Sequence, residues 1–124
     1  MSTVLVVEDN ELNRRLFVDL LSTRGYKILE ATDGQKALDM VQKHEPDLVL
    51  MDIQLPGVSG LDVTAQIRSN TNIKQPRIVA ISAFALKQDV DKAIEAGCDD
   101  YISKPIAIAS FFQTIEKNLQ ADQG

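Results

Sequence analysis

The chain alternates between short apolar runs and longer stretches in which apolar residues recur every three or four positions. The runs have the length and β-branched content of buried strands, and the longer stretches have the period of amphipathic helices. Strands are predicted at residues 4–7, 26–31, 48–52, 77–81 and 100–103. Helices are predicted from Asn10 to about Gly25, from the Asp33-Gly34 turn to His44, and over residues 60–69, 86–96 and 108–119. This alternation with short connections predicts a parallel sheet covered by helices on both faces.

The helix boundaries carry suitable capping residues. Asn10 can accept a hydrogen bond from the first turn of the helix after it, and Gly97 can adopt the left-handed conformation that ends the fourth helix. An apolar stripe on the first helix is expected to pack in the core. It consists of Leu12, Leu16, Phe17, Leu20 and Leu21.

The third predicted strand is an uninterrupted apolar run, Leu-Val-Leu-Met, that ends on Asp52. Such a run is typical of a central strand buried on both faces. The second strand is interrupted by Lys27 and Glu30 and is expected nearer an edge. In open α/β sheets ligands bind at the carboxyl ends of the strands, so Asp52 lies where a ligand is expected.

Composition narrows the class of protein. A length of 124 residues predicts a single domain over residues 1–124. The net charge of −5 disfavours nucleic acid as a partner. The sequence contains no apolar stretch long enough to span a bilayer, and its lone cysteine, Cys98, fits a reducing compartment. We therefore expect a cytoplasmic protein with neither nucleic-acid nor membrane partners.

Reactive polar residues follow four of the five strands. Glu8 and Asp9 follow the first, Asp52 ends the third, Ser82 ends the fourth and Lys104 follows the fifth. A parallel sheet brings these ends to one edge. Two carboxylates about 4 Å apart repel by roughly 4 kcal/mol at an effective dielectric constant near 20, so the acids need cations. Lys104 offsets one charge, and Mg²⁺ prefers the oxygen ligands that carboxylates and water provide.

An acidic Mg²⁺ pocket with a lysine and a hydroxyl on its far side is suited to a phosphoryl group. The metal and Lys104 would neutralise phosphoryl oxygens, and Ser82 would donate a hydrogen bond. An aspartate can attack phosphorus to form an acyl phosphate. Asp52, on the central strand, is the predicted phosphoryl acceptor.

At these residues the sequence resembles the receiver domains of two-component response regulators. The matching segments are Val-Val-Glu-Asp-Asn at 6–10, Leu-Met-Asp-Ile-Gln-Leu-Pro at 50–56, Ser-Gly at 59–60, Ile-Ser-Ala at 81–83 and Tyr-Ile-Ser-Lys-Pro at 101–105. They span the chain in the expected order. The resemblance implies a five-stranded α/β sandwich of the flavodoxin-like, CheY-like type with strand order 2-1-3-4-5. Within the family the chain is most similar to single-domain regulators of cell division.

The resemblance also implies a role for individual residues. Asp52 would be the phosphorylated aspartate, Asp9 a direct Mg²⁺ ligand, and Glu8 a second acid that often acts through water. The main-chain carbonyl of Gln54 would complete the protein ligands of Mg²⁺.

Four further residues match family positions on the other side of the pocket. Ser82 and Lys104 would contact the phosphoryl group. Tyr101 would be the aromatic residue that switches position, and the peptide bond before Pro105 would be cis.

The function implied is a signalling switch rather than an enzyme with an external product. A sensor histidine kinase or a histidine phosphotransfer protein would donate the phosphoryl group to Asp52, and the domain would catalyse its own phosphorylation and dephosphorylation. The face formed by residues 86–96, 100–103 and 108–119 would then bind a downstream protein.

Alternatives remain at the sequence level. The chain could be a phosphorelay intermediate or the receiver of a hybrid histidine kinase. A Mg²⁺-dependent phosphatase is a remote alternative, because haloacid dehalogenase-type phosphatases carry two aspartates separated by one residue, whereas here Glu8 and Asp9 are adjacent. Structural interpretations compete at single residues: Asp9 or Asn10 as a helix cap, Tyr101 as simple packing, and Phe84 either as packing or as a barrier to water at the pocket.

Overall fold

The computed structural model describes residues 2–84 and 86–121. Its strands form one parallel sheet in the order β2-β1-β3-β4-β5, which confirms the predicted topology. The strands are β1 (Thr3–Val7), β2 (Lys27–Ala31), β3 (Leu48–Asp52), β4 (Arg77–Ser82) and β5 (Asp100–Ser103). The helices are α1 (Glu11–Ser22), α2 (Gly34–His44), α3 (Gly60–Ser69), α4 (Lys87–Ala96) and α5 (Ile108–Ala121).

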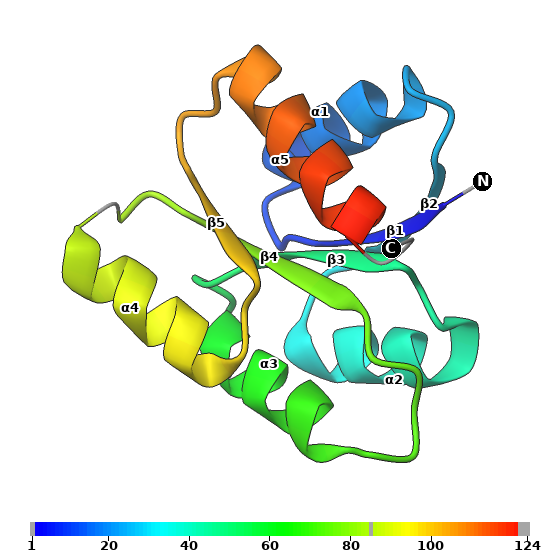
Figure 1. Ribbon diagram of the computed structural model, residues 1–124, viewed down its shortest axis with the longest axis vertical. Helices are drawn as coiled ribbons and strands as arrows, with labels where there is room; N and C mark the ends of the chain where they lie inside the picture. The colour runs from blue at the N-terminus through cyan, green and yellow to red at the C-terminus, as the bar shows by residue number, and fades with distance from the viewer. Residues whose placement is uncertain (1, 85, 122–124) are drawn as a thin grey trace.

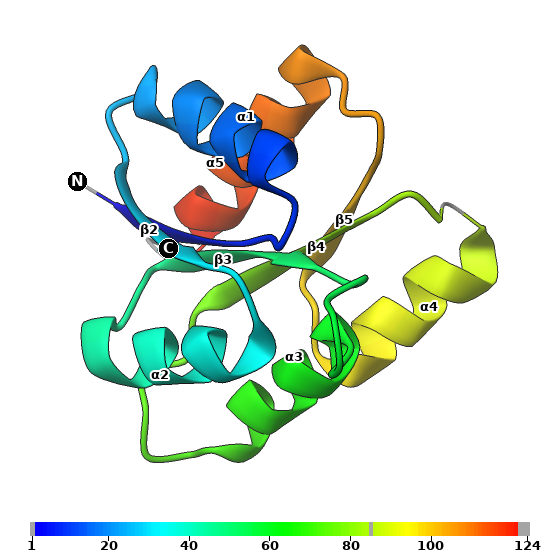
Figure 2. The same cartoon turned by 180° about the vertical axis from the view of Figure 1, so that it is seen from behind.

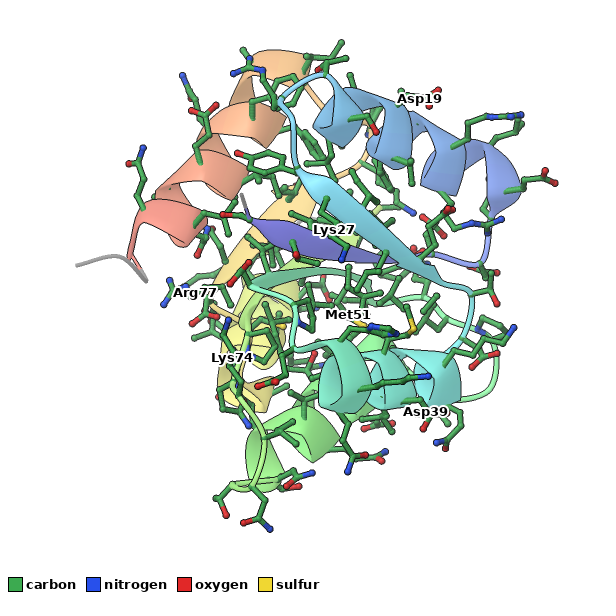
Figure 3. The ribbon with its side chains drawn as sticks, turned by 90° about the vertical axis from the view of Figure 1, so that its right-hand side faces the viewer. Asp19, Lys27, Asp39, Met51, Lys74 and Arg77 are labelled. Atoms are coloured by element: carbon green, nitrogen blue, oxygen red, sulfur yellow. The ribbon has the colours of Figure 1, made fainter. Side chains whose placement is uncertain are left out.

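The sheet is the middle layer of a three-layer structure. Helices α1 and α5 cover one face, and α2, α3 and α4 cover the other (Figures 1 and 2). β2 lies at an edge, as its polar interruptions predicted, and Figure 3 looks onto this edge, where Lys27 is exposed. β3 lies in the centre, and each of its five residues is buried.

The period of two along the strands divides the core into two clusters. Leu5, Val49 and Met51 face α2 and α3, where Met51 lies between the sheet and α2 (Figure 3). Alternate residues of the same strands pack against Phe17 of α1 and Phe111 of α5. The two phenyl rings stack with a centroid separation of 5.9 Å and join the two helices.

The observed helix ends follow the capping chemistry. The Asn10 side chain accepts the Asn13 N–H at 3.0 Å, and Asp33 caps α2 through the Lys36 N–H at 2.9 Å. Gly97 ends α4 with φ at 115°, a conformation that favours glycine. The predicted first residue of the fourth helix, Leu86, is instead its N-cap and provides no side-chain hydrogen bond.

The prediction that the whole apolar stripe of the first helix is buried is wrong. Phe17 and Leu21 are buried, but Leu12 is 79% exposed and Leu16 is 43% exposed. The helix begins just beyond the carboxyl end of β1, so its first two turns extend past the strands on which they would pack. Leu16 lies instead in a groove beside Pro105 and Ile106.

Candidate functional site

The carboxyl edge of the sheet gathers acidic side chains from two neighbouring strands. β1 and β3 pair in register up to Val7 and Met51, so the residues that follow, Glu8 and Asp52, emerge side by side. Asp9 extends the cluster, and one carboxylate oxygen from each of the three acids lies within 4.8 Å of the others. The predicted grouping of Glu8, Asp9 and Asp52 is therefore present.

The three acids differ in exposure. Glu8 and Asp52 are only 1% and 2% exposed, whereas Asp9 is exposed to solvent. Hard oxygen donors with one accessible side are the donor set that suits Mg²⁺, which keeps several waters when it binds to proteins. The residues of this cluster fit a divalent cation.

Lys104 reaches the cluster from the loop after β5. Its Nζ lies 3.0 Å from Glu8 Oε1 and 3.3 Å from Asp52 Oδ2, so it bridges the two buried carboxylates. Burial would lower the pKa of Lys104, but Glu8 and Asp52 overcome this and raise it. With all groups ionised, three carboxylates and one ammonium leave two negative charges, which a single divalent cation would neutralise.

The buried position of Glu8 disfavours its charged form. Burial is the main cause that raises the pKa of Glu8 from 4.5 to about 7, and the neighbouring Asp52 carboxylate adds to it. Lys104 and the Asn10 N–H act in the opposite direction. Near neutral pH, Glu8 therefore takes up a proton readily in the absence of a second cation.

The main chain around Asp52 holds its carboxylate in place. The Gln54 N–H donates to Asp52 Oδ1 at 2.8 Å, and the Ile53 N–H continues the sheet by donating to the Ile81 carbonyl at 3.1 Å. Gly60, at the start of α3, packs directly on this segment, because a Cβ there would lie 2.1 Å from the Asp52 carbonyl oxygen. The Gln54 side chain is exposed, so it is the main chain of Gln54 that lies next to Asp52.

Ser82 and Tyr101 meet at Phe84 rather than at the acidic cluster. The buried Ser82 Oγ accepts the Phe84 N–H at 3.1 Å, and the Tyr101 hydroxyl donates to the Phe84 carbonyl. The peptide bond between Lys104 and Pro105 is cis. The predicted site residues thus form two connected groups, one around Asp52 and one around Phe84.

Two features of the site were missed in the sequence. Arg14 of α1 donates to the Glu8 carbonyl, and an apolar groove of about 380 Å³ between Leu16, Ile106 and Ala83 runs beside Lys104. A signal for the groove was present in the sequence, since Leu16 is an apolar residue of α1 in addition to Phe17 and Leu21, which fill the core. Cys98, by contrast, is buried and its thiol pKa is raised to about 11, mainly by burial, as expected of a packed residue.

Comparison with known proteins decides the family. Residues 4–116 match the response regulator receiver domain. The chain belongs to this family. The match confirms the CheY-like fold and a function in two-component signalling, and it favours that function over the phosphatase alternative. Receiver domains are signalling switches rather than conventional enzymes.

Individual relatives agree with this assignment. The polar-differentiation response regulator DivK of Brucella anthropi is 45% identical over 117 residues, which cover 94% of this chain and 95% of the relative. The receiver domain of the sensor histidine kinase PA1611 from Pseudomonas aeruginosa, solved with a magnesium ion in its active-site cleft, is 30% identical with a TM-score of 0.87 over 96% of this chain and 98% of its own. The Ssk1 receiver of Saccharomyces cerevisiae, solved with the phosphotransfer protein Ypd1, is 30% identical with a TM-score of 0.83 over 92% of this chain and 86% of that chain.

These relatives make the protein a DivK-like receiver domain, as the sequence resemblance predicted. Receiver domains bind Mg²⁺ in their active site and interact with histidine kinases or phosphotransfer proteins. Within residues 2–84 and 86–121, no helix has the length and apolar character needed to cross a membrane.

Proposed function

We propose that Asp52 accepts a phosphoryl group from the phosphohistidine of a sensor histidine kinase or a histidine phosphotransfer protein. One observation carries this proposal: the Asp52 carboxylate is buried and held at both oxygens, by the Gln54 N–H at 2.8 Å and by Lys104 at 3.3 Å. A carboxylate held in a fixed orientation is prepared for in-line attack, since its positioning is complete before the donor arrives. We also propose that residues 1–124 act as one cytoplasmic receiver domain.

Glu8, Asp9, Asp52 and the Gln54 carbonyl would hold Mg²⁺, because the three carboxylates already cluster and Gln54 adjoins them. When bound, the ion neutralises negative charge on the phosphoryl oxygens. The transfer itself takes place between Asp52 and the donor histidine. An Asp52 oxygen forms a bond to phosphorus, the phosphorus–nitrogen bond breaks, and its electron pair stays on the donor imidazole.

Lys104 and Ser82 would receive the new phosphoryl group. Lys104 already touches Asp52 Oδ2, so a small movement brings its ammonium to a phosphoryl oxygen. Ser82 uses an oxygen lone pair to accept the Phe84 N–H, and its own O–H remains a donor for a phosphoryl oxygen. The same groups would position the water that later hydrolyses the acyl phosphate, with the Phe84 side chain beside the pocket limiting its access.

The signal would travel from Ser82 to Tyr101 through the main chain of Phe84, because both hydroxyls bind that residue. Movement of Ser82 toward a phosphoryl group weakens its hold on Phe84 and changes the position that Tyr101 prefers. The face of α4, β5 and α5 would then favour a different population of states, which a downstream protein could distinguish by its differential affinity.

The phosphoryl donor would dock on the apolar groove beside Lys104. Leu16 lines the groove together with Pro105 and Ile106, and Leu12, one helical turn before Leu16 on α1, is also exposed. Exposed apolar surface rimmed by polar residues commonly marks a protein-binding site, and Asn13 and Lys104 border this groove. A donor seated there would present its histidine to Asp52 across a short distance.

The test is labelling with acetyl phosphate in the presence and absence of Mg²⁺, read by intact mass. The wild type and Asp39→Asn should gain one phosphoryl group only with Mg²⁺, and Asp52→Asn should gain none. Asp39 is a matched control because it is exposed on α2 (Figure 3). Equal labelling of Asp52→Asn and the wild type would refute the assignment of the acceptor.

A second candidate function, onward transfer in a phosphorelay, requires contact with a histidine phosphotransfer protein. The likeness to the Ssk1 receiver, the downstream response regulator solved with Ypd1, supports that contact and leaves the direction of transfer to experiment. Likeness to the PA1611 receiver supports a related place within a hybrid histidine kinase. Labelled protein should then lose its phosphoryl group much faster when a histidine phosphotransfer protein is added. A loss no faster than spontaneous hydrolysis would leave the signalling switch as the function.

A further inference from the structure

Arg14 is the one residue of α1 whose side chain reaches both the metal-ligand loop and the edge strand among the described residues. Its Nη1 donates to the main-chain carbonyl of Glu8 at 3.1 Å. Its Nε donates to Glu30 Oε1 of β2, also at 3.1 Å. The Arg14 side chain is only 19% exposed, so it is held against this part of the protein rather than extended into solvent.

The contact with the Glu8 carbonyl has a geometric consequence. That carbonyl belongs to the peptide bond that joins Glu8 to Asp9, and these two residues supply two of the three clustered carboxylates. The preceding N–H, that of Glu8, donates to the Ala31 carbonyl at 3.0 Å and extends the ladder between β1 and β2. With β2 holding one side of Glu8 and Arg14 the other, the plane of the Glu8–Asp9 peptide is fixed.

From this geometry we infer that Arg14 is a positioning residue for the metal site: it orients the Glu8–Asp9 peptide so that both carboxylates converge with Asp52, and Glu30 holds its guanidinium in place. The inference rests on the proposed Mg²⁺ site. Groups that orient metal ligands without touching the metal commonly affect affinity by about 10- to 100-fold.

Electrostatics and positioning predict opposite effects, which makes the inference testable. Arg14 is a cation near an acidic cluster, so loss of its charge alone would strengthen binding of Mg²⁺. Loss of its positioning role would weaken it. Arg15 is the matched control, because it is an arginine on the same helix but is exposed.

The experiment measures the Kd for Mg²⁺ by calorimetry, since the chain has no tryptophan to report binding. We expect Arg14→Gln to raise Kd about tenfold and Glu30→Gln to raise it less. Arg14→Lys should give an intermediate value, because a lysine keeps the charge but lacks the planar fork that places Nε and Nη1 at two separate acceptors. Arg15→Gln should leave Kd unchanged or lower it. In acetyl phosphate labelling, Arg14→Gln should raise the Mg²⁺ concentration for half-maximal rate, with the rate at saturating Mg²⁺ preserved.

A purely structural role for Arg14 would lower the free energy of unfolding without a change in Kd. A Kd for Arg14→Gln within about twofold of that for Arg15→Gln would therefore overturn the inference. If Arg14→Gln does not fold, an unchanged Kd in Glu30→Gln, whose side chain is 52% exposed, would overturn it instead. If the wild type fails to bind Mg²⁺, both the proposed metal site and this inference are overturned. If the wild type and Arg14→Gln bind Mg²⁺ with equal affinity, only this inference is overturned.

Discussion

Ser82 and Tyr101, on neighbouring strands, bind opposite sides of the same residue: Ser82 Oγ accepts the N–H of Phe84, and the Tyr101 hydroxyl donates to its carbonyl. The two hydroxyls do not hydrogen-bond to each other. Their energies should nevertheless be coupled, because each hydrogen bond helps to hold the Phe84 main chain where the other needs it.

A double-mutant cycle tests this coupling. Ser82→Ala and Tyr101→Phe should each lower the free energy of unfolding by about 1 kcal/mol, and the double variant should lose less than the sum by at least about 0.5 kcal/mol. Urea denaturation without Mg²⁺ gives the three values. Strict additivity would show that the two hydroxyls act on Phe84 independently.

Stability without metal should fall as the pH rises toward and past neutrality. The pKa of Glu8 is about 7 in the folded protein and 4.5 ordinarily, so the folded state binds the proton more tightly. The stabilisation that this provides is complete below pH 4.5 and is lost as the pH rises through 7, by up to about 3 kcal/mol. Urea titrations in EDTA should show this decline.

Glu8→Gln supplies the comparison for the pH effect. This variant should lack the decline and should be more stable than the wild type at pH 8 in EDTA. Saturating Mg²⁺ should stabilise the wild type more than the variant, because only the wild type has the third carboxylate. A wild type whose stability is independent of pH between 5 and 8 would contradict the assignment of a raised pKa to Glu8.

Removal of the Lys104 ammonium should strengthen the binding of Mg²⁺. Lys104→Met removes the cation 3.0 Å from Glu8 and 3.3 Å from Asp52, so Mg²⁺ meets less electrostatic competition and its Kd should fall about fivefold. Lys43→Met, a change of the same charge at an exposed site on α2, should leave Kd unchanged. A weaker Mg²⁺ complex in Lys104→Met would mean that the lysine organises the carboxylates rather than competing for them.

Gly60→Ala should be markedly destabilising for a steric reason. The new Cβ would lie 2.1 Å from the Asp52 carbonyl oxygen, so the main chain that carries Asp52 must move, at a cost of at least about 2 kcal/mol. Gly25→Ala is the matched control: its φ of 78° is unfavourable for alanine, but no atom lies within 4 Å, and about 1 kcal/mol is expected. Equal costs in urea denaturation would remove the steric explanation.

The exposed leucines at the start of α1 should affect the rate of phosphoryl transfer from a protein donor but not from acetyl phosphate. Leu12→Ser should change stability by no more than about 0.5 kcal/mol, because the side chain is 79% exposed, yet it should slow transfer from a phosphohistidine protein about tenfold. Labelling by acetyl phosphate should be unchanged. Ile94→Ser, at an exposed apolar residue of α4, is the control and should affect neither reaction.

Much of the fold could be predicted because its signals are local. Uninterrupted apolar runs, Asn10 as a cap and Gly97 as a helix end depend on chemistry within a few residues, and all three are present in the structure. The convergence of Glu8, Asp9 and Asp52 could also be predicted, since parallel strands place their carboxyl ends at one edge.

The remaining features depend on where elements end relative to one another. Periodicity assigned Leu12 and Leu16 to the core, but it carries no information on how far α1 extends past the sheet. In the same way, residue type alone could not show that Glu8 would be buried while the adjacent Asp9 is exposed, or that Arg14 would reach back to the Glu8 carbonyl.

The groove beside Lys104 also includes Ala83, the residue immediately before Phe84. A donor that occupies the groove therefore rests against the segment that is expected to rearrange once Asp52 is phosphorylated. Transfer of the phosphoryl group would then change the surface to which the donor is bound. Release of the donor would therefore follow phosphorylation of Asp52. A kinase that binds in this groove would dissociate once it has phosphorylated the receiver, and it could then phosphorylate further receivers.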